Sequence, residues 1–172
     1  MIEAVVITIS DSVNAGTRED VSGPAVKKRL ETRGWRVPAV EVLADERRLI
    51  ANRLRFLSDT NQAPVIFTTG GTGLAARDVT PEATRDAIER EIPGISEVMR
   101  AVGRQSTKLA PLSRTVAGTR GKTLIVNLPG SPRGAVESLD AIVDLVPHII
   151  DLLNGRTEHV PEHRTETTPA AS

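Results

Sequence analysis

Two glycine-rich loops are the stretches of this sequence whose residue types and spacing could do chemistry. The first glycine loop, residues 69–73, reads Thr-Gly-Gly-Thr-Gly, and the second glycine loop, residues 127–131, reads Asn-Leu-Pro-Gly-Ser. Glycine lets a backbone bend sharply and approach a ligand closely. Each loop leads into a Thr-Pro or Ser-Pro pair typical of a helix start, where backbone amides attract anions. We expect the loops to hold two anionic groups, such as phosphates on two substrates; ordinary tight turns are the competing interpretation.

Two aspartates near these loops are candidate catalytic residues. We expect Thr80 to cap the helix after the first loop, so Asp78 is not needed as a cap. Asp45 lies between a predicted strand and a predicted helix, so a helix cap is its competing interpretation. Mg²⁺ is commonly held by one or two carboxylates together with substrate phosphates. Asp45 and Asp78 therefore predict a magnesium site, with Arg77 and Arg114 as further counter-charge.

Other motifs in the sequence are incomplete. Gly121-Lys122-Thr123 resembles the end of a P-loop, but Val116 stands where the first glycine is required and a strand follows, so Lys122 fits a solvated surface base better. A Gly-x-Gly-x-x-Ala pattern from residue 71 lacks the acid expected at the end of the next strand. A generic nucleotide-binding protein is therefore a weaker alternative. The histidines lack the spacing of zinc ligands.

The apolar pattern alternates between strands and helices along the chain. Runs rich in Val and Ile predict strands over residues 2–9, 35–43, 63–69, 113–117 and 123–128, the last two as a hairpin around 118–122. Apolar residues at helical spacing predict helices over 24–33, 46–58, 81–91 and 95–107, and a closing helix kinked at Pro147. This order predicts a three-layer α/β/α domain with a mostly parallel, mixed sheet. Pro38 places the second strand near the sheet edge.

Four loops should meet at one edge of this sheet, because the carboxyl ends of parallel strands lie together and form the usual ligand-binding side. These loops are residues 10–12, 44–46, 69–78 and 127–131. Besides the two aspartates, the candidate substrate-binding and nucleotide-binding residues are Ser10, Asp11, Thr69, Gly70, Gly71, Thr72, Gly73, Asn127, Pro129, Gly130 and Ser131.

The composition is that of a single cytoplasmic domain. The 172 residues carry no net charge and three aromatic side chains, which argues against nucleic acid or an anionic membrane as a partner. The absence of cysteine fits the cytosol and excludes disulfides. No apolar run reaches the ~18–20 residues of a membrane span. We expect a folded domain over residues 1–155 and a flexible tail over 156–172, which is rich in threonine and proline.

The motifs resemble those of the molybdenum cofactor biosynthesis family, which includes MogA, MoaB and the G domain of gephyrin. The resemblance is carried by both glycine loops, by Arg-Asp-Val-Thr-Pro-Glu-Ala at residues 77–83, by Ser-Asp-Ser at 10–12, by Glu-Asp-Val-Ser-Gly at 19–23 and by Leu-Ser-Arg at 112–114. It runs from about residue 2 to residue 155. The motifs stand in the family's order, which makes the resemblance specific.

The resemblance implies a molybdopterin adenylyltransferase, in which the terminal phosphate of molybdopterin attacks the α-phosphate of MgATP. Asp45 and Asp78 match the family's two functional aspartates: Asp45 would position Mg²⁺, and Asp78 would orient the pterin substrate or the metal. The family also implies a homotrimer, or a hexamer in its MoaB-like branch. A non-catalytic molybdopterin carrier of the MoaB type is the alternative. Which loop holds the pterin, and whether molybdenum or tungsten is used downstream, stay open.

Overall fold

A computed structural model describes residues 1–156. Residues 157–172, which make up nearly all of the tail predicted over 156–172, lie outside the described residues. The chain forms one sheet of six strands: β1 (Ala4–Ile9), β2 (Val40–Leu43), β3 (Val65–Thr69), β4 (Arg90–Glu91), β5 (Ala117–Arg120) and β6 (Thr123–Leu128).

The sheet has the strand order β2-β1-β3-β6-β5-β4. The first four strands in that order run parallel, β5 runs antiparallel to β6, and the short edge strand β4 runs antiparallel to β5. The mixed sheet and the hairpin of β5 and β6 are confirmed. β2 lies at the edge, as predicted, but it begins at Val40, after Pro38, which has no N–H to donate to a sheet ladder.

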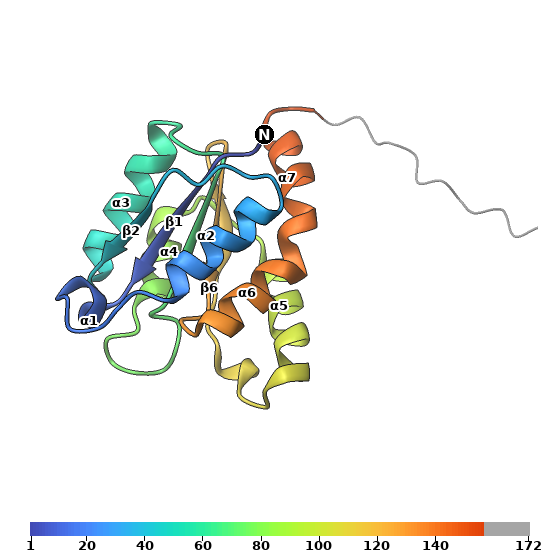
Figure 1. Ribbon diagram of the computed structural model, residues 1–172. Coiled ribbons are helices and arrows are strands. Elements are labelled where there is room, and N and C mark those ends of the chain that lie inside the picture. Colours follow the sequence, from blue (N-terminus) through green and yellow to red (C-terminus); the bar gives the residue numbers. More distant parts are fainter. Residues whose placement is uncertain (157–172) are drawn as a thin grey trace, which may run out of the picture.

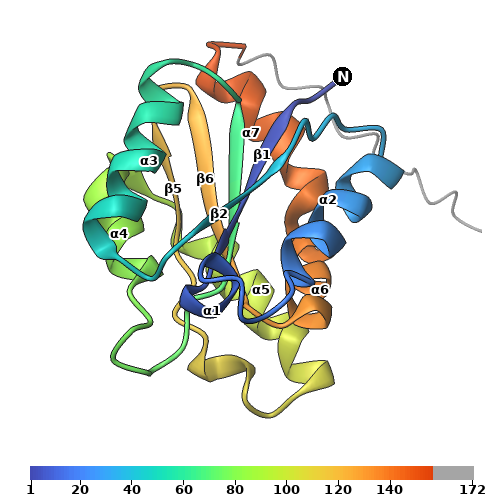
Figure 2. The same ribbon diagram turned by 60° about the vertical axis from the view of Figure 1, so that its left-hand side comes forward.

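Helices cover both faces of this sheet. They are α1 (Asp11–Asn14), α2 (Ser22–Thr32), α3 (Arg47–Asp59), α4 (Thr80–Ala87), α5 (Pro93–Ser106), α6 (Pro132–Ile142) and α7 (Val146–Leu153), with 3₁₀ turns at Ala110–Leu112 and Val143–Leu145. Helices α3 and α4 lie on one face, and α2, α5, α6 and α7 lie on the other (Figures 1 and 2). The predicted three-layer architecture is therefore confirmed.

The core is divided by the sheet into two apolar clusters. Alternate residues of β3 point to opposite faces, so that Phe67 packs in the cluster under α2, α6 and α7, and Ile66 packs in the cluster under α3 and α4. Val126 and Ile125 of β6 divide in the same way. Because both faces are covered, β1, β3 and β6 are buried at nearly every position.

Besides β2, three predicted elements differ from the structure. The helix predicted over 81–91 ends at Ala87, and Arg90–Glu91 pairs with β5 as a short edge strand. The strand predicted over 113–117 begins only at Ala117. The closing helix is divided by the 3₁₀ turn Val143–Leu145 instead of being kinked at Pro147. A two-residue strand of charged residues has no apolar alternation by which a sequence could reveal it.

Asn127, a predicted binding residue, does not reach a cavity in the described structure. Its side chain is fully buried, and its Oδ1 accepts a hydrogen bond from Val116 N–H over 3.2 Å. Its Nδ2 donates to the hydroxyls of Thr68 and Thr84, over 3.0 and 2.8 Å. Asn127 therefore joins β6 to β3, to α4 and to the segment before β5, beneath the second glycine loop.

Replacing Asn127 with alanine should destabilise the fold. The substitution leaves a buried N–H and two buried hydroxyls without their partner, so we expect a loss of about 2–4 kcal/mol in the free energy of unfolding. Urea denaturation measures this loss. Asn52→Ala, at an exposed position of α3, is the matched control and should cost less than about 0.5 kcal/mol. Equal effects of the two substitutions would contradict the structural role.

Candidate functional site

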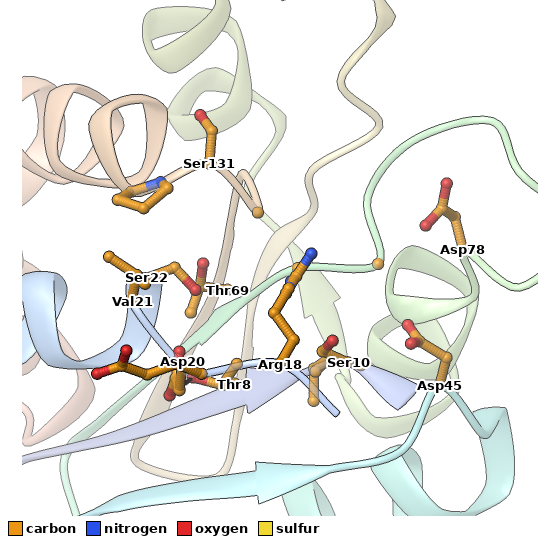
Figure 3. Close-up of a pocket in the computed structure, with 16 residues that line it drawn as sticks. Thr8, Ser10, Arg18, Asp20, Val21, Ser22, Asp45, Thr69, Asp78 and Ser131 are labelled. Carbon is orange, nitrogen blue, oxygen red and sulfur yellow. Dashed lines mark hydrogen bonds between the residues drawn. The ribbon is translucent and has the colours of Figure 1, made fainter. Parts of the chain in front are cut away.

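A cavity of about 690 Å³ opens at the carboxyl ends of the parallel strands. The loops after β1, β2, β3 and β6 meet there, as the sequence predicts (Figure 3). It is lined by Thr8, Ile9, Ser10, Arg18, Glu19, Asp20, Val21, Ser22, Asp45, Thr69, Gly70, Gly71, Asp78, Gly130, Ser131 and Pro132.

The two glycine loops touch each other at the floor of this cavity. The Thr69 hydroxyl donates a hydrogen bond to the carbonyl of Pro129 over 2.7 Å. Gly70 has φ +103°, and a Cβ added there would lie 2.2 Å from the carbonyl oxygen of Ile9. A Cβ on Gly130 would lie 3.2 Å from the Gly70 Cα. The glycines are therefore required by close backbone contact as well as by turn geometry.

Gly70→Ala tests this contact, with Gly34→Ala as its matched control. Gly34 also has a positive φ, of +78°, but no atom lies within 4 Å of its added Cβ. We expect Gly34→Ala to cost about 1–2 kcal/mol from backbone strain alone. Gly70→Ala adds a clash with Ile9, so its cost should be larger by at least about 1 kcal/mol. Urea denaturation compares the two variants, and equal costs would show that the close approach is unimportant.

Helices α2 and α6 begin at the cavity wall. Ser131 is the N-cap of α6, and its hydroxyl accepts from Gly134 N–H over 3.1 Å. At the start of α2, the Asp20 carboxylate accepts from Gly23 N–H over 3.1 Å and from the Thr8 hydroxyl over 2.7 Å. The first-turn amides and the dipoles of both helices favour negative charge in the cavity.

Asp45 is held by its neighbour Asp11 and is not a helix cap. The backbone N–H of Asp11 donates to Asp45 Oδ2 over 2.8 Å, and the N–H of Asp45 donates to Asp11 Oδ1 over 3.0 Å. The N-cap of α3 is Glu46, which makes no side-chain capping bond. Burial raises the pKa of Asp45, and the nearby charges of Asp11 and Asp78 raise it further.

Arg77 neutralises Asp11 at the rim of the cavity. Its guanidinium donates two hydrogen bonds to the Asp11 carboxylate, over 2.8 and 2.9 Å. These bonds lower the pKa of Asp11 and keep that carboxyl ionised. Arg77 therefore supplies counter-charge to a protein carboxylate, while Asp45, the neighbouring acid, has no such arginine partner in the described part of the chain.

Asp78 lies in a loop that Arg114 fixes in place. Asp78 Oδ2 accepts a hydrogen bond from Ala75 N–H over 2.9 Å. Arg114 donates to the carbonyls of Gly73 and Asp78, over 2.8 and 2.6 Å, and forms an ion pair with Glu82. Arg114, considered from the sequence as counter-charge for a ligand, is occupied by these internal contacts. Thr80, expected as a helix cap, is the first residue of α4 after the cap position Val79, so that prediction is wrong.

The structure brings together most of the predicted site residues. Both aspartates line the cavity, together with Ser10, Thr69, Gly70, Gly71, Gly130 and Ser131. The predicted residues that do not line it are Asp11, Thr72, Gly73, Asn127 and Pro129. Lys122 lies in the turn before β6, at the opposite end of the sheet.

Sequence reasoning missed the contribution of the loop between α1 and α2. Arg18, Glu19, Asp20 and Val21 of this loop line the cavity, as does Ser22 at the start of α2, yet the loop has no apolar periodicity to mark its course. The one signal was the Glu-Asp-Val-Ser-Gly motif at residues 19–23, which entered only through the family resemblance.

The two lining aspartates fit a magnesium ion. Asp45 and Asp78 each use one carboxylate oxygen for a backbone hydrogen bond, and no hydrogen bond within residues 1–156 uses the other. Oxygen donors of this kind suit Mg²⁺. No group of three or more His, Cys, Asp or Glu side chains within residues 1–156 is arranged to hold a metal. The remaining ligands would therefore be water and substrate phosphate.

A smaller cavity of about 190 Å³ adjoins the main one. It lies between α5, the 3₁₀ turn at Ala110–Leu112 and α6, and Ser131 lines both cavities. Met99 and Leu109 contribute to its wall. The buried hydroxyls of Ser113 and Thr115 also line it and have no hydrogen-bond partner in the described residues. A lining of apolar side chains with a few polar groups is typical of small-molecule sites.

Comparison with known proteins decides the family. A family model described as a probable molybdopterin binding domain matches residues 5–148. The chain belongs to this molybdopterin-binding family. Among its relatives, the molybdopterin adenylyltransferase of Helicobacter pylori J99 is 40% identical over 161 residues, which cover 91% of this chain and 90% of that protein. The enzyme of the same name from Escherichia coli K12 is 36% identical, with 91% and 88% covered.

A solved structure confirms the fold of this molybdopterin-binding protein. The molybdopterin biosynthesis enzyme MoaB from Thermus thermophilus is 46% identical, has a TM-score of 0.84, and is matched over 90% of this chain and 98% of its own. The resemblance read from the motifs is therefore confirmed, and so is the α/β class.

Asp45→Asn should keep or raise stability at neutral pH. When folding raises the pKa of a carboxyl, the folded protein loses stability as pH rises from the ordinary pKa through the raised value. This loss persists at every higher pH. Asparagine removes this charge and keeps an oxygen for Asp11 N–H. Thermal melts at pH 7 and pH 4 test the sign: the variant should melt at or above the wild-type temperature at pH 7, and the difference should shrink at pH 4. If Asp45→Asn melts below the wild-type protein at pH 7 but not at pH 4, the raised pKa of Asp45 is contradicted.

Proposed function

We propose that this protein is a molybdopterin adenylyltransferase of molybdenum cofactor biosynthesis. A phosphate oxygen of molybdopterin forms a new bond to the α-phosphorus of ATP. The bond between that phosphorus and the bridging oxygen to the β-phosphate breaks, and pyrophosphate leaves with the electron pair. The products are adenylyl-molybdopterin and pyrophosphate. The names of relatives aligned over about nine-tenths of their length support this activity over a carrier role.

The contact between the two glycine loops is the observation that carries this proposal. Transfer between two phosphates requires both to be held close and in line, and little reactive side-chain chemistry is needed. The hydrogen bond from Thr69 to Pro129 and the contact of Gly70 with Gly130 fix the two loops side by side. We assign one phosphate-bearing substrate to each loop, next to the N-termini of α2 and α6. The adjoining 190 Å³ cavity would accept a heterocyclic ring.

The two aspartates come from different loops of this site. Asp45 and Asp78 lie on the same side of the cavity in Figure 3. We assign to them the Mg²⁺ that accompanies ATP, with Asp45 held in orientation by Asp11 and Asp78 by the loop that Arg114 fixes. Magnesium bound there would supply positive charge to the reacting phosphates.

We further propose a cytoplasmic homotrimer, with a hexamer as the alternative assembly. This assignment rests on the family resemblance, and light scattering coupled to size-exclusion chromatography tests it. Within residues 1–156, none of the helices is both long and apolar enough to cross a membrane. The proposed partners are small molecules, molybdopterin and ATP, without nucleic acid or membrane.

A direct assay tests the activity. Purified protein with molybdopterin and MgATP should form adenylyl-molybdopterin and pyrophosphate, and omission of Mg²⁺ should abolish both. Asp45→Asn and Asp78→Asn should each lower the rate by about 10²-fold or more, because each removes fixed negative charge that positions the cation. Both variants should still bind molybdopterin.

Asp144→Asn is the matched control for these variants. Asp144 is largely exposed and pairs with Arg33 away from the cavity, so its replacement should leave the rate unchanged. Absence of product from the wild-type protein, beside an active adenylyltransferase, would favour the non-catalytic carrier. Full activity of Asp45→Asn would show that Asp45 is not a ligand of the metal.

A further inference from the structure

The cavity carries more negative than positive charge, although its proposed substrates are anions. Its lining includes four carboxylates, those of Glu19, Asp20, Asp45 and Asp78. Arg18 is the single basic side chain among the lining residues, all of which belong to the described part of the chain. Helix dipoles offset part of this charge, and the proposed Mg²⁺ would offset more. Arg18, an exposed residue at the cavity wall, is the basic side chain that remains.

Arg18 is also uncommitted, unlike the other arginines around the site. Arg77 is held by Asp11, and Arg114 is held by Glu82 and two carbonyls. No hydrogen bond or ion pair within residues 1–156 uses the guanidinium of Arg18. Its side chain extends across the middle of the cavity toward the loop that carries Ser131 (Figure 3). A free guanidinium there can form two parallel hydrogen bonds to a phosphate.

The loop that carries Arg18 is fixed on both sides. The carbonyl of Ser12 accepts hydrogen bonds from the backbone N–H groups of Thr17 and Arg18, over 2.9 and 3.2 Å, and from the Thr17 hydroxyl over 3.0 Å. On the other side, Asp20 is bonded to Thr8 and to the start of α2. The backbone of Arg18 is therefore already held in place, so only its side chain loses conformational freedom when a ligand binds.

We infer that Arg18 is a substrate-binding residue that holds a phosphate group at the meeting point of the two glycine loops. This inference rests on the proposed function for the identity of the substrates. The phosphate is either one of the triphosphate, retained in the product pyrophosphate, or the terminal phosphate of molybdopterin. Arg18 supplies positive charge to the bound phosphate, which the four lining carboxylates would otherwise repel.

Arg18→Ala in the full chain tests this inference. Calorimetric titration with pyrophosphate in the presence of Mg²⁺ should show an affinity about tenfold to hundredfold weaker than that of the wild-type protein, the range expected for charge-assisted hydrogen bonds. The affinity should also depend less steeply on KCl concentration, because one charge contact is gone. Arg18→Lys, which keeps the charge and loses the fork, should fall between the two.

Arg36→Ala is the matched control, since Arg36 is an exposed arginine beside the amino end of β1 and pairs with Glu3. It should bind pyrophosphate like the wild-type protein. If Arg18→Ala binds pyrophosphate normally but has a KM for molybdopterin raised by a similar factor, the phosphate is that of the pterin and the inference holds. Unchanged behaviour toward both ligands would overturn it. So would a weaker affinity with an unchanged salt dependence, which indicates lost packing.

Pyrophosphate binding by Arg18 and adenylyl transfer can be tested separately. Pyrophosphate binding requires no turnover, so a wild-type protein that binds pyrophosphate through Arg18 but forms no adenylyl-molybdopterin would keep this inference and refute the activity. Circular dichroism of Arg18→Ala should match that of the wild-type protein, because the guanidinium makes no hydrogen bond or ion pair within residues 1–156 that supports the fold.

Discussion

The close approach of three backbone segments at Gly70 is the constraint on which the site depends. Gly70 lies against the carbonyl of Ile9 and against Gly130. Its φ of +103° is a backbone conformation that residues with a side chain rarely adopt. Strands β1, β3 and β6 are adjacent and parallel, so their ends deliver these segments to one place. The sheet topology thus determines where the loops meet, and the absence of a Cβ determines how closely they meet.

A second constraint is the repulsion between neighbouring carboxylates, which lowers the stability of the folded protein. The reciprocal hydrogen bonds between Asp11 and Asp45 hold two carboxylates close together, and within residues 1–156 only Asp11 of the two is paired with an arginine, Arg77. Burial and the neighbouring acids raise the pKa of Asp45, which means that its ionised form is destabilised in the folded protein. Carboxyls with a raised pKa of this kind cluster at functional sites.

The sequence predicts the architecture well because both signals that it uses are local. Apolar runs revealed the central strands, and glycine with proline revealed the two loops. What it could not supply are contacts between distant residues: Asn127 belongs to the second glycine loop by position, yet its partners Thr68 and Thr84 make it a buried support. Asp45 sits where a helix cap would, and only the fold brings Asp11 to it. Arg18 lies in a polar loop without periodicity, so its place in the cavity depends on tertiary contacts.

The distribution of arginines explains how such an acidic cavity can bind anions. Arg77 and Arg114 are bound to protein oxygens, so they fix the geometry of Asp11 and of the loop around Asp78 before any ligand arrives. Their charge is already matched, and the remaining excess of carboxylates repels a bare polyphosphate. In the proposed function, a nucleotide that arrives with its metal ion would bring positive charge to the aspartates, and Arg18 would contact its phosphate. Under the proposed function, this charge arrangement would favour a metal-bound nucleotide over a free one.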